Sequence, residues 1–524
     1  MKNRIDFDYG EEDLLSRHGR VENGRLFVGK CAYKKVLAAG MEVIRSSTLE
    51  LLEEFAKQGG TVIFAGGIPE YVDTVLSDRS KKLAAAVISI PFRSEDIAEA
   101  CRSGNEIGVQ GQGEEYIFAQ VRLDGGTKSV MLLNVNRKEG YRDLTICLGE
   151  GESAELWDAR TGQVSVPEQY QEEGRIFVKT DIEKGGEKLY VVTAKKRDLA
   201  EGKQKHLKYN RIACDNNKFS YQLGEANICV LDKVSIETET GEVIPYMEVL
   251  KADQKLRDLY GIPHRGGEML QPWYENKYGS SSVALGRIRL CYKFEAEHIP
   301  ESLAVAVEDL EHILEISING QPVIIKSNGK WLDICFDKIN IPGSLLQPGK
   351  NELCLDYDYY RTCGVEAVYL LGEFGVKIDE QEAFAKLTSL PEKLSIGDIT
   401  YQGLPFYSGR LSYLIEEIEG LDKEYVQIKI PKWEGACLKF IGEEEKTIAF
   451  APYEADIHGL KEIQLFLTRR NTFGPLHQLP AKSIAYGPDN FLTQGKEWSD
   501  AYVLYPQGIM GEPEFYRVSE DGMV

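Results

Sequence analysis

The pattern that most constrains this chain is a series of short alternating apolar and polar runs, which begins near residue 115 and continues toward the C-terminus. Tyr116–Leu123 and Leu314–Ile318 are examples, and the turn residues Asp124-Gly125-Gly126 and Asn319-Gly320 follow them. Alternation with a period of two places every second side chain on one face of a strand, and Asn-Gly is typical of a tight hairpin turn. Most of the chain is therefore predicted to be antiparallel β-structure. At about 150 residues per domain, a length of 524 residues predicts three to four folded units.

The first 110 residues follow a different pattern. Ser47–Glu50 is predicted to be a capping box, the following apolar residues recur at helical spacing, and Gly59-Gly60 ends the helix. Val36–Ala39 and Thr61–Ala65 are predicted to be buried strands on either side of it, which makes a βαβ unit with parallel strands. An α/β sheet normally opens with a strand, whereas this chain begins near a predicted helix over 11–18. We therefore expect the sheet to lack its first strand and to expose a strand edge.

Changes in pattern along the chain divide it into four predicted domains. They are an α/β domain over 1–112, a small antiparallel β-domain over 113–196, and two tandem β-sandwiches over 209–380 and 390–524. The basic segment Lys195-Lys196-Arg197 begins a predicted linker, and Pro391 and Gly397 mark the join between the sandwiches.

Charge and cysteine usage exclude several classes of function. The chain carries 83 acidic and 62 basic residues, a net charge of −21, whereas nucleic acids and anionic membranes bind clustered Lys and Arg. No apolar run reaches the roughly 18 residues of a membrane span, and the start of the chain lacks the apolar core of a secretion signal, so we expect a cytoplasmic protein. The ten cysteines include no Cys-x-x-Cys pair, and we expect them to be reduced and structural.

Several segments resemble parts of one enzyme family, the large α-L-rhamnosidase-type glycoside hydrolases. Phe7–Leu15, Arg45–Leu49 and Gly59–Phe64 resemble the family's middle domain, which has a flavodoxin-like, amidotransferase-like fold similar to the trimerisation domain of some β-galactosidases. Glu155–Gly162 resembles the small β-domain that follows. The segments similar to the family's C-terminal jelly rolls, which are of the galactose-binding type, are Gln271–Trp273, Val365–Gly375, Gln402–Gly409 and Arg470–His477.

The resemblance implies a function without a catalytic domain. In that family a (β/α)8 barrel precedes these domains and carries the catalytic carboxylates, and this sequence has no such repetition of strand and helix. The implied function is a carbohydrate-associated accessory portion or subunit of a glycoside hydrolase. Two alternatives stay open: an active rhamnosidase-like or family-two-like glycosidase whose barrel lies on a partner chain or a preceding segment, and a scaffold that binds no sugar. The implied partners are carbohydrate and either a barrel-bearing catalytic subunit or a second copy of this chain.

Four aromatic residues are candidates for sugar contact. Sugar sites combine the faces of aromatic rings with fixed polar groups. Trp273 and Tyr274 occupy a predicted loop, Tyr407 lies in a turn flanked by glycines, and Trp433 follows a proline. Packing in a core or between domains is the alternative for each. We expect Trp273 and Tyr407 to be at least partly exposed, on the face where a barrel would dock.

Two polar candidates complete the predicted sugar site. Glu308 follows the apolar strand Ala304–Val307, where its carboxylate could face a sugar or pair with an arginine. His477 lies beside the turn Gly474-Pro475, where it could face a ligand or cap the backbone. No catalytic carboxylate pair is identified, because adjacent acids arise by chance among 83. We expect no cofactor and no transition metal; a structural calcium ion would suit carboxylate-rich jelly rolls, although no Asp-x-Asp-x-Asp-Gly loop is present.

Overall fold

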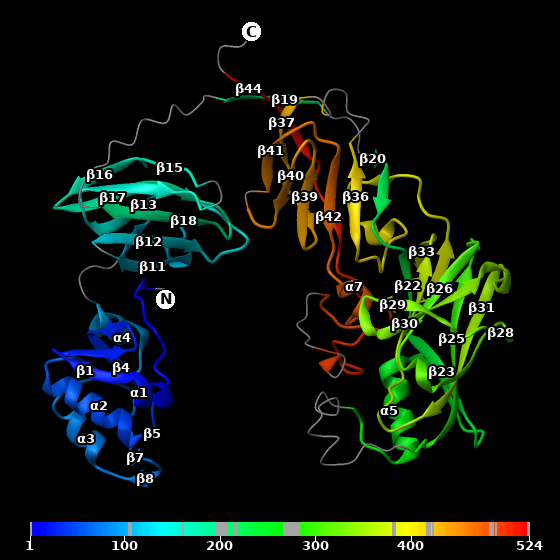
Figure 1. Cartoon of the computed structure of the whole chain (residues 1–524), viewed down its shortest axis with the longest axis horizontal. Helices are drawn as coiled ribbons and strands as arrows, with labels where there is room; N and C mark the ends of the chain where they lie inside the picture. Colours follow the sequence, from blue (N-terminus) through cyan, green and yellow to red (C-terminus); the bar gives the residue numbers. More distant parts are fainter. Residues whose placement is uncertain are drawn as a thin grey trace. The chain divides into compact units, whose positions relative to one another are not determined.

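The computed structural model describes residues 3–102, 107–124, 126–159, 162–193, 207–213, 218–265, 283–379, 384–415, 421, 424–451, 453–481, 487 and 490–520. The chain is β-rich and divides into two compact units, Met1–Gln204 and Lys205–Val524 (Figure 1). In these described ranges, no helix has both the length and the apolar composition needed to cross a membrane.

The N-terminal part of the first unit contains the predicted βαβ unit. Strands β4 (Lys35–Ala39), β6 (Thr61–Ala65) and β9 (Ile88–Ile90) lie parallel in this order, and helices α2 (Ser46–Lys57) and α3 (Arg79–Ala84) connect them along the chain. Leu49, Leu52 and Phe55 are buried on one face of α2 and belong to the same core as β6. Among the described residues β4 pairs with β6 alone, so β4 is an edge strand; the absence of a first strand stays a prediction.

Shorter elements surround this parallel sheet. They are α1 (Glu12–His18), β1 (Gly19–Glu22), β2 (Arg25–Val28), β3 (Cys31–Tyr33), β5 (Val43–Ile44), β7 (Tyr71–Val72), β8 (Val75–Leu76) and α4 (Ser94–Cys101). Helix α1 confirms the helix predicted over 11–18, whereas the antiparallel sheet β1–β2–β3 was not predicted, because strands this short carry little alternation.

The predicted capping box is wrong. The N-cap of α2 is Arg45, which makes no side-chain cap bond, and the Asp73 carboxylate instead accepts from the Ser46 N–H at 3.0 Å.

The second part of the first unit consists of two antiparallel sheets around one core. Their strand orders are β10-β13-β17-β16 and β11-β12-β18-β14-β15. The strands are β10 (Gly108–Gln110), β11 (Ile117–Asp124), β12 (Thr127–Asn134), β13 (Tyr141–Glu150), β14 (Ser153–Trp157), β15 (Val164–Ser165), β16 (Gln169–Glu172), β17 (Arg175–Ile182) and β18 (Glu187–Thr193). Ile117, Leu132 and Ile146 are fully buried between the sheets. The predicted small β-domain therefore also includes β10, which precedes its expected start.

The second unit contains two sandwiches, and the first is built from a five-stranded and an eight-stranded sheet. The smaller sheet has the order β22 (Asn227–Leu231), β32 (Val368–Gly372), β26 (Ser302–Val307), β30 (Asp333–Pro342), β29 (Ser327–Trp331). The larger has the order β24 (Val243–Glu248), β23 (Lys233–Thr238), β25 (Gly286–Ala296), β31 (Gly349–Tyr359), β27 (Ile313–Ile318), β28 (Gln321–Val323), and β33 (Gly375–Asp379) and β34 (Phe384–Thr388) extend it. Helix α5 (Val249–Tyr260) follows β24. The predicted Asn319-Gly320 turn joins β27 to β28, and both residues have the positive φ that this turn requires.

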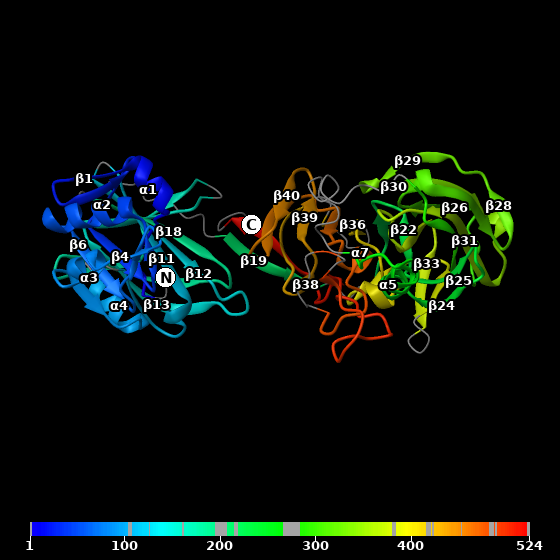
Figure 2. The ribbon, with the colours of Figure 1, turned by 90° about the horizontal axis from the view of Figure 1, so that it is seen from below.

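The second sandwich also has two antiparallel sheets. One has the order β19 (Leu207–Ile212), β44 (Glu514–Glu520), β37 (Tyr425–Lys429), β41 (Glu454–His458), and the other β21 (Tyr221–Leu223), β36 (Arg410–Leu414), β42 (Glu462–Phe466), β39 (Cys437–Ile441), β40 (Glu445–Ile448). Two small pairs accompany them: β20 (Lys218–Phe219) with β35 (Leu394–Ser395), and β38 (Trp433–Glu434) with β43 (Gly508–Ile509). The short helix α7 (Arg470–Phe473) lies between strands of the two sandwiches (Figures 1 and 2).

The chain enters the second sandwich before it builds the first, which differs from the predicted division at residues 209 and 390. Strands β19 and β21 come from the region expected in the first sandwich, yet β19 pairs with β44 and β21 pairs with β36. These pairings join residues about 200 to 300 positions apart, and no local pattern in a sequence reports such partners.

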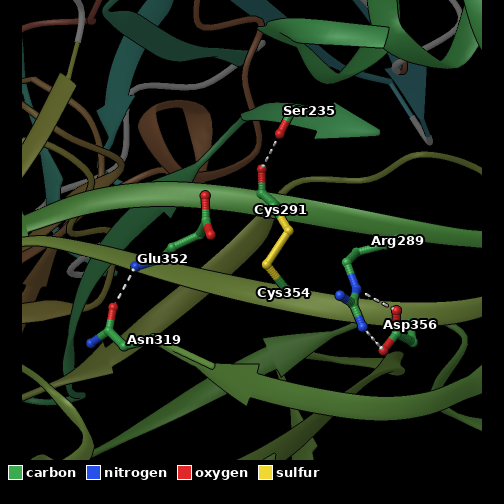
Figure 3. Close-up of a disulfide and its surroundings, with 7 residues drawn as sticks. All are labelled: Ser235, Arg289, Cys291, Asn319, Glu352, Cys354 and Asp356. Atoms are coloured by element: carbon green, nitrogen blue, oxygen red, sulfur yellow. Dashed lines mark hydrogen bonds and ion pairs between the residues drawn. A yellow bond between two sulfur atoms is a disulfide. The ribbon is translucent and has the colours of Figure 1, made fainter. Parts of the chain in front are cut away.

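Two cysteines overturn the expectation of a fully reduced chain. Cys291 in β25 and Cys354 in β31 lie opposite each other and form a disulfide (Figure 3). Among the cysteines that the structure describes, Cys147, Cys229 and Cys363 are free and buried, as predicted for structural thiols.

Candidate functional site

Three ionisable side chains from separate segments meet at one end of the first sandwich. Glu308 directly follows β26, and Glu366 lies two residues before β32. These strands run antiparallel with Ala306 opposite Tyr369, so the end of one strand and the start of the other meet at the same end of the sheet. Arg265, beyond helix α5, places its Nη1 atom 2.5 Å from the Glu366 Oε1 atom.

Helix α5 fixes the loop that carries Glu366. Asp253 and Arg257 lie on its buried face, one helical turn apart, with Arg257 Nε 3.0 Å from Asp253 Oδ2. Arg257 Nη2 also donates to the Cys363 carbonyl at 2.6 Å, and Asp253 Oδ1 accepts from the Val365 N–H at 3.0 Å. Asp253 Oδ2 lies 3.6 Å from Arg265 Nε as well. The same buried carboxylate therefore holds both the loop and the arginine that faces Glu366.

Gly364 makes the close approach of Arg265 feasible. A Cβ atom at this position would lie 2.1 Å from Arg265 Nη1 and 2.6 Å from Glu366 Oε1. Any side chain here would therefore displace the guanidinium group from the Glu366 carboxylate.

Glu308 is a half-buried carboxyl group without a hydrogen-bond or ion-pair partner in the described part of the chain. Burial raises its pKa to about 8, and the neighbouring Glu366 and Asp309 carboxylates act in the same direction, while Arg265 opposes them. Burial also raises the pKa of Glu366 against the opposing charge of Arg265. At neutral pH, Glu308 is therefore mostly protonated, so its carboxyl group can donate one hydrogen bond and accept others.

A small pocket opens beside these acids. Its lining includes the polar residues Glu308, Glu366, Tyr292 and Tyr357, and Leu290, Val307, Leu355, Gly364, Ala367 and Val368 complete it. The Tyr292 hydroxyl donates to the Glu366 carbonyl at 2.8 Å, and Tyr357 bonds the side chain of Asp309. Small-molecule sites also combine an apolar wall with a few convergent polar groups, but this pocket has room for about one water molecule, so a larger ligand would contact the acids from its mouth.

Aromatic rings lie next to the acids along the chain. His312 follows Asp309 by three residues, and its ring centroid is 4.4 Å from that of Tyr360. Both rings are half-buried, so each keeps an accessible edge or face. We call Glu308, Glu366, Arg265 and the lining of this pocket the Glu308 pocket.

The predicted site residues do not all converge on this pocket. Glu308 lies in it, whereas Trp273 and Tyr274 fall outside the described residues. Trp433 is half-buried in β38, packs against the core of the second sandwich, and meets the Tyr453 ring edge-on at 5.3 Å. A sugar-binding role for Trp273, Tyr274 and Trp433 stays a prediction.

The expected exposure of Tyr407 is wrong. Its side chain is fully buried in the core of the second sandwich, and its hydroxyl donates to the Arg410 carbonyl at 2.6 Å and accepts from the Gly224 N–H at 3.0 Å. The whole segment Leu404–Gly409 is buried, so it forms a buried connection between the two sandwiches and not an exposed turn.

His477 is a buried structural residue rather than a ligand-facing one. Its Nε2 atom lies 3.0 Å from Asp232 Oδ2, and its Nδ1 atom lies 2.9 Å from the Ser499 carbonyl. Because both nitrogens face acceptors, both donate, and the ring is positively charged. Burial alone would lower the pKa of His477, but the charge and hydrogen bond of Asp232 outweigh it and raise the pKa.

Sequence reasoning missed Glu366 and Arg265. Glu366 lies beside the apolar strand Val368–Gly372, so the signal that selected Glu308, an acid flanking a buried strand, could also have found it. No pattern singles out Arg265, because tertiary contacts with Asp253 and Glu366 place it.

The structural calcium ion stays a prediction. Among the described residues, one group of three His, Cys, Asp or Glu side chains could hold a metal ion, and it consists of Cys291, Glu352 and Cys354. Two of its three ligand atoms are sulfur, whereas calcium is bound by oxygen.

Comparisons with known proteins give partial likeness only. No protein-family model matches the sequence, and neither does any curated protein sequence. Among solved structures, a rhamnosidase from Novosphingobium sp. PP1Y is 16% identical with a TM-score of 0.32, and the match covers 68% of this chain and 32% of that one. An exo-carrageenase GH42 from Bacteroides ovatus is 14% identical (TM-score 0.21; 31% and 22% covered), and a β-galactosidase from Bacillus circulans sp. alkalophilus is 12% identical (TM-score 0.23; 31% and 33% covered). The chain thus spans about a third or less of the length of these structures, and the TM-scores assign it to no family.

Proposed function

We propose that this chain is a carbohydrate-associated accessory portion of a glycoside hydrolase and that it binds a neutral sugar at the Glu308 pocket. The proposal includes the architecture that the sequence resembles: a flavodoxin-like N-terminal domain and two jelly rolls of the galactose-binding type. The observation that carries it is the Glu308 carboxyl group, which is half-buried and has no partner in the described chain.

A sugar hydroxyl supplies what Glu308 lacks. Solvent still reaches the half-buried Glu308 carboxyl group, so a sugar hydroxyl would replace water as its hydrogen-bond partner. A hydroxyl group both donates and accepts, which matches a protonated carboxyl group. Beside it, the Arg265–Glu366 pair offers a charged donor and a charged acceptor for a second hydroxyl.

Charge favours a neutral ligand over an anionic one. Three acids, Glu308, Glu366 and Asp309, lie together with Arg265, and their raised pKa values show that added negative charge is unfavourable here. A neutral glycoside is therefore expected to bind, and a uronic acid is expected to bind weakly or not at all.

The test is a calorimetric titration of the full chain with the methyl glycosides of L-rhamnose, D-galactose and D-glucuronic acid. We expect one of the two neutral glycosides to bind, and Glu308→Ala to weaken binding about 10-fold to 100-fold, as for the loss of one strong hydrogen bond. Glu301→Ala is the matched control, because Glu301 is exposed at the opposite end of the same strand β26. Equal affinity of the two variants, or no binding of either neutral glycoside, would contradict the proposal.

One feature of the same pocket favours catalysis as a second candidate function. A mostly protonated acid next to a carboxylate is the arrangement in which one carboxyl group can act as a general acid and the other as a nucleophile or base. The Arg265 ion pair argues against this role, since it engages the Glu366 carboxylate. Release of nitrophenol from aryl α-L-rhamnosides or β-D-galactosides that Glu308→Ala abolishes and Glu301→Ala preserves would establish a glycosidase instead.

A further inference from the structure

Four small residues form a row on the outer face of the larger sheet of the first sandwich. Ser235, Cys291, Cys354 and Ser317 lie opposite one another across β23, β25, β31 and β27. The strands alternate, so the neighbours of each cysteine along its strand are buried in the core, while both cysteines are half-buried on the outer face. The two sulfur atoms therefore face solvent, and the flanking serine side chains are too small to cover them.

Charged side chains lie on either side of this row. Arg289 and Asp356 form a bidentate pair, with distances of 2.7 and 2.8 Å, on one side (Figure 3). Lys293 and Glu352 lie opposite each other on the other side. Glu352 is exposed, and one of its carboxylate oxygens lies within 4.8 Å of the sulfur atoms of Cys291 and Cys354.

We propose that Cys291, Cys354 and Glu352 bind a thiophilic divalent cation such as Zn²⁺ once the Cys291–Cys354 disulfide is reduced. The disulfide is then the oxidised, metal-free form of the site. Two thiolates and one carboxylate are ligands that zinc accepts in a tetrahedral arrangement, and a water molecule can take the fourth position. The exposed position of Glu352 leaves that fourth position open to solvent.

The backbone keeps the ligands together when the disulfide opens. Strands β25 and β31 pair along 11 residues, from Gly286 opposite Tyr359 to Ala296 opposite Gly349. The Cα atoms of the two cysteines are 4.2 Å apart within this ladder. Because strand pairing and the core beneath it hold the two positions, the cross-link is not needed to bring the sulfur atoms near each other.

The chemistry proceeds in two balanced steps. A dithiol reductant supplies two electrons and two protons: the Cys291–Cys354 S–S bond breaks, two S–H groups form, and the sulfurs of the reductant join as its own disulfide. The cation then forms two metal–sulfur bonds and displaces both thiol protons to solvent. In the reverse direction, a disulfide oxidant accepts two electrons from the two thiolates: its own S–S bond breaks to give two thiolates, the Cys291–Cys354 bond forms again, and the cation is released.

The experiment uses the full chain with the exposed free cysteines removed as Cys31→Ser and Cys335→Ser. The protein is reduced with dithiothreitol, freed of it without oxygen, and titrated with Co²⁺, whose bonds to thiolates absorb in the near ultraviolet. We expect one equivalent of Co²⁺ to bind the reduced chain, Zn²⁺ to displace it, and no absorption band in the oxidised chain. Cys354→Ser should abolish the band, and Glu352→Gln should weaken Co²⁺ binding about 10-fold or more.

Glu315→Gln is the matched control, because Glu315 is an exposed acid on the neighbouring strand β27 and should leave Co²⁺ binding unchanged. Far-ultraviolet circular dichroism checks that the reduced chain keeps its strands. Three results would overturn the proposal: no thiolate band in the reduced, folded chain, an equal band in Cys354→Ser, or loss of β-structure on reduction alone.

Discussion

Two acids of the first sandwich, Asp232 and Glu308, are both shielded from solvent, yet their pKa values shift in opposite directions. Asp232 is 5% exposed, and His477 and the Tyr502 hydroxyl both bond its carboxylate. Burial alone would raise the pKa of Asp232, but the charge and hydrogen bond of His477 hold it below its usual value. Glu308 has no such partner in the described chain, and burial raises its pKa to about 8. The partner, and not the depth of burial, decides which buried carboxyl group is charged at neutral pH.

The Asp232–His477 pair should make stability depend on pH in a defined window. The pKa of His477 is raised above 6.5, so its contribution is complete below pH 6.5 and is lost as pH rises through the folded-state value. The pKa of Asp232 is lowered below 3.8, so its contribution is complete above pH 3.8 and is lost as pH falls through the folded-state value. The pair therefore stabilises most between pH 3.8 and pH 6.5.

Thermal unfolding of the parent chain and of His477→Gln from about pH 3 to about pH 9 measures this contribution. We expect His477→Gln to cost about 3–5 kcal/mol inside the window, because it leaves a buried carboxylate uncompensated, and to cost less outside it. His458→Gln is the control, since the His458 and Glu443 side chains are 45% and 69% exposed. A cost of His477→Gln that does not change with pH would refute the pairing.

At the scale of the element, the segment Leu404–Gly409 joins the two sandwiches through adjacent side chains. Phe406 belongs to the core of the first sandwich, and Tyr407 belongs to the core of the second. Backbone atoms of the same segment also form hydrogen bonds: the Phe406 carbonyl accepts from the Thr472 hydroxyl of α7 at 2.9 Å, and the Gly409 carbonyl accepts from the Leu467 N–H at 3.3 Å. Because these two successive residues belong to different cores, the segment packs against both sandwiches of the second unit.

Two tyrosines six residues apart test this arrangement. Tyr407→Ala should destabilise the second unit by about 3–5 kcal/mol, as for other large buried side chains, and should lower the denaturation midpoint in urea. Tyr401→Ala is the matched control, because the Tyr401 side chain is 83% exposed and should change stability by less than about 0.5 kcal/mol. Similar effects of the two substitutions would contradict the assignment of Tyr407 to the core.

Local patterns predicted the elements of this chain better than their partners. The βαβ unit around α2, the Asn319-Gly320 turn and the strand that ends before Glu308 follow from periodicity and turn chemistry, which act over a few residues. The burial of Tyr407 and the Arg265–Glu366 pair depend on segments far apart along the chain, so no local pattern contains them. Cys291 and Cys354 lie opposite each other only in the register of β25 against β31, and no pattern along either strand alone contains that pairing.

At the scale of the whole molecule, the path of the chain ties the second unit together. The chain contributes β19, β20 and β21 to the second sandwich, builds the first sandwich, and then returns to complete the second. Phe219, in β20, is 2% exposed in the core of the second sandwich. The second sandwich therefore cannot be complete without residues that precede the first, although the compact unit Lys205–Val524 contains both.

Two truncated chains test this path. A chain that begins at Lys205 retains all strands of the second unit and should unfold cooperatively. A chain that begins at Glu225 lacks β19, β20 and β21, which uncovers one edge each of β44 and β36 and removes Phe219 from the core. Uncovered strand edges promote association, so we expect this shorter chain to unfold at a lower temperature and to aggregate.

A peptide covering residues 205–224 supplies the missing strands in trans. It should bind the shorter chain by strand addition and raise the unfolding temperature, whereas a scrambled peptide of the same composition should do neither. Circular dichroism melting with and without peptide, together with light scattering, measures both effects. If the chain that begins at Glu225 melts at the same temperature as the chain that begins at Lys205, the early strands are not part of the second sandwich, and the two sandwiches are independent segments of the sequence after all.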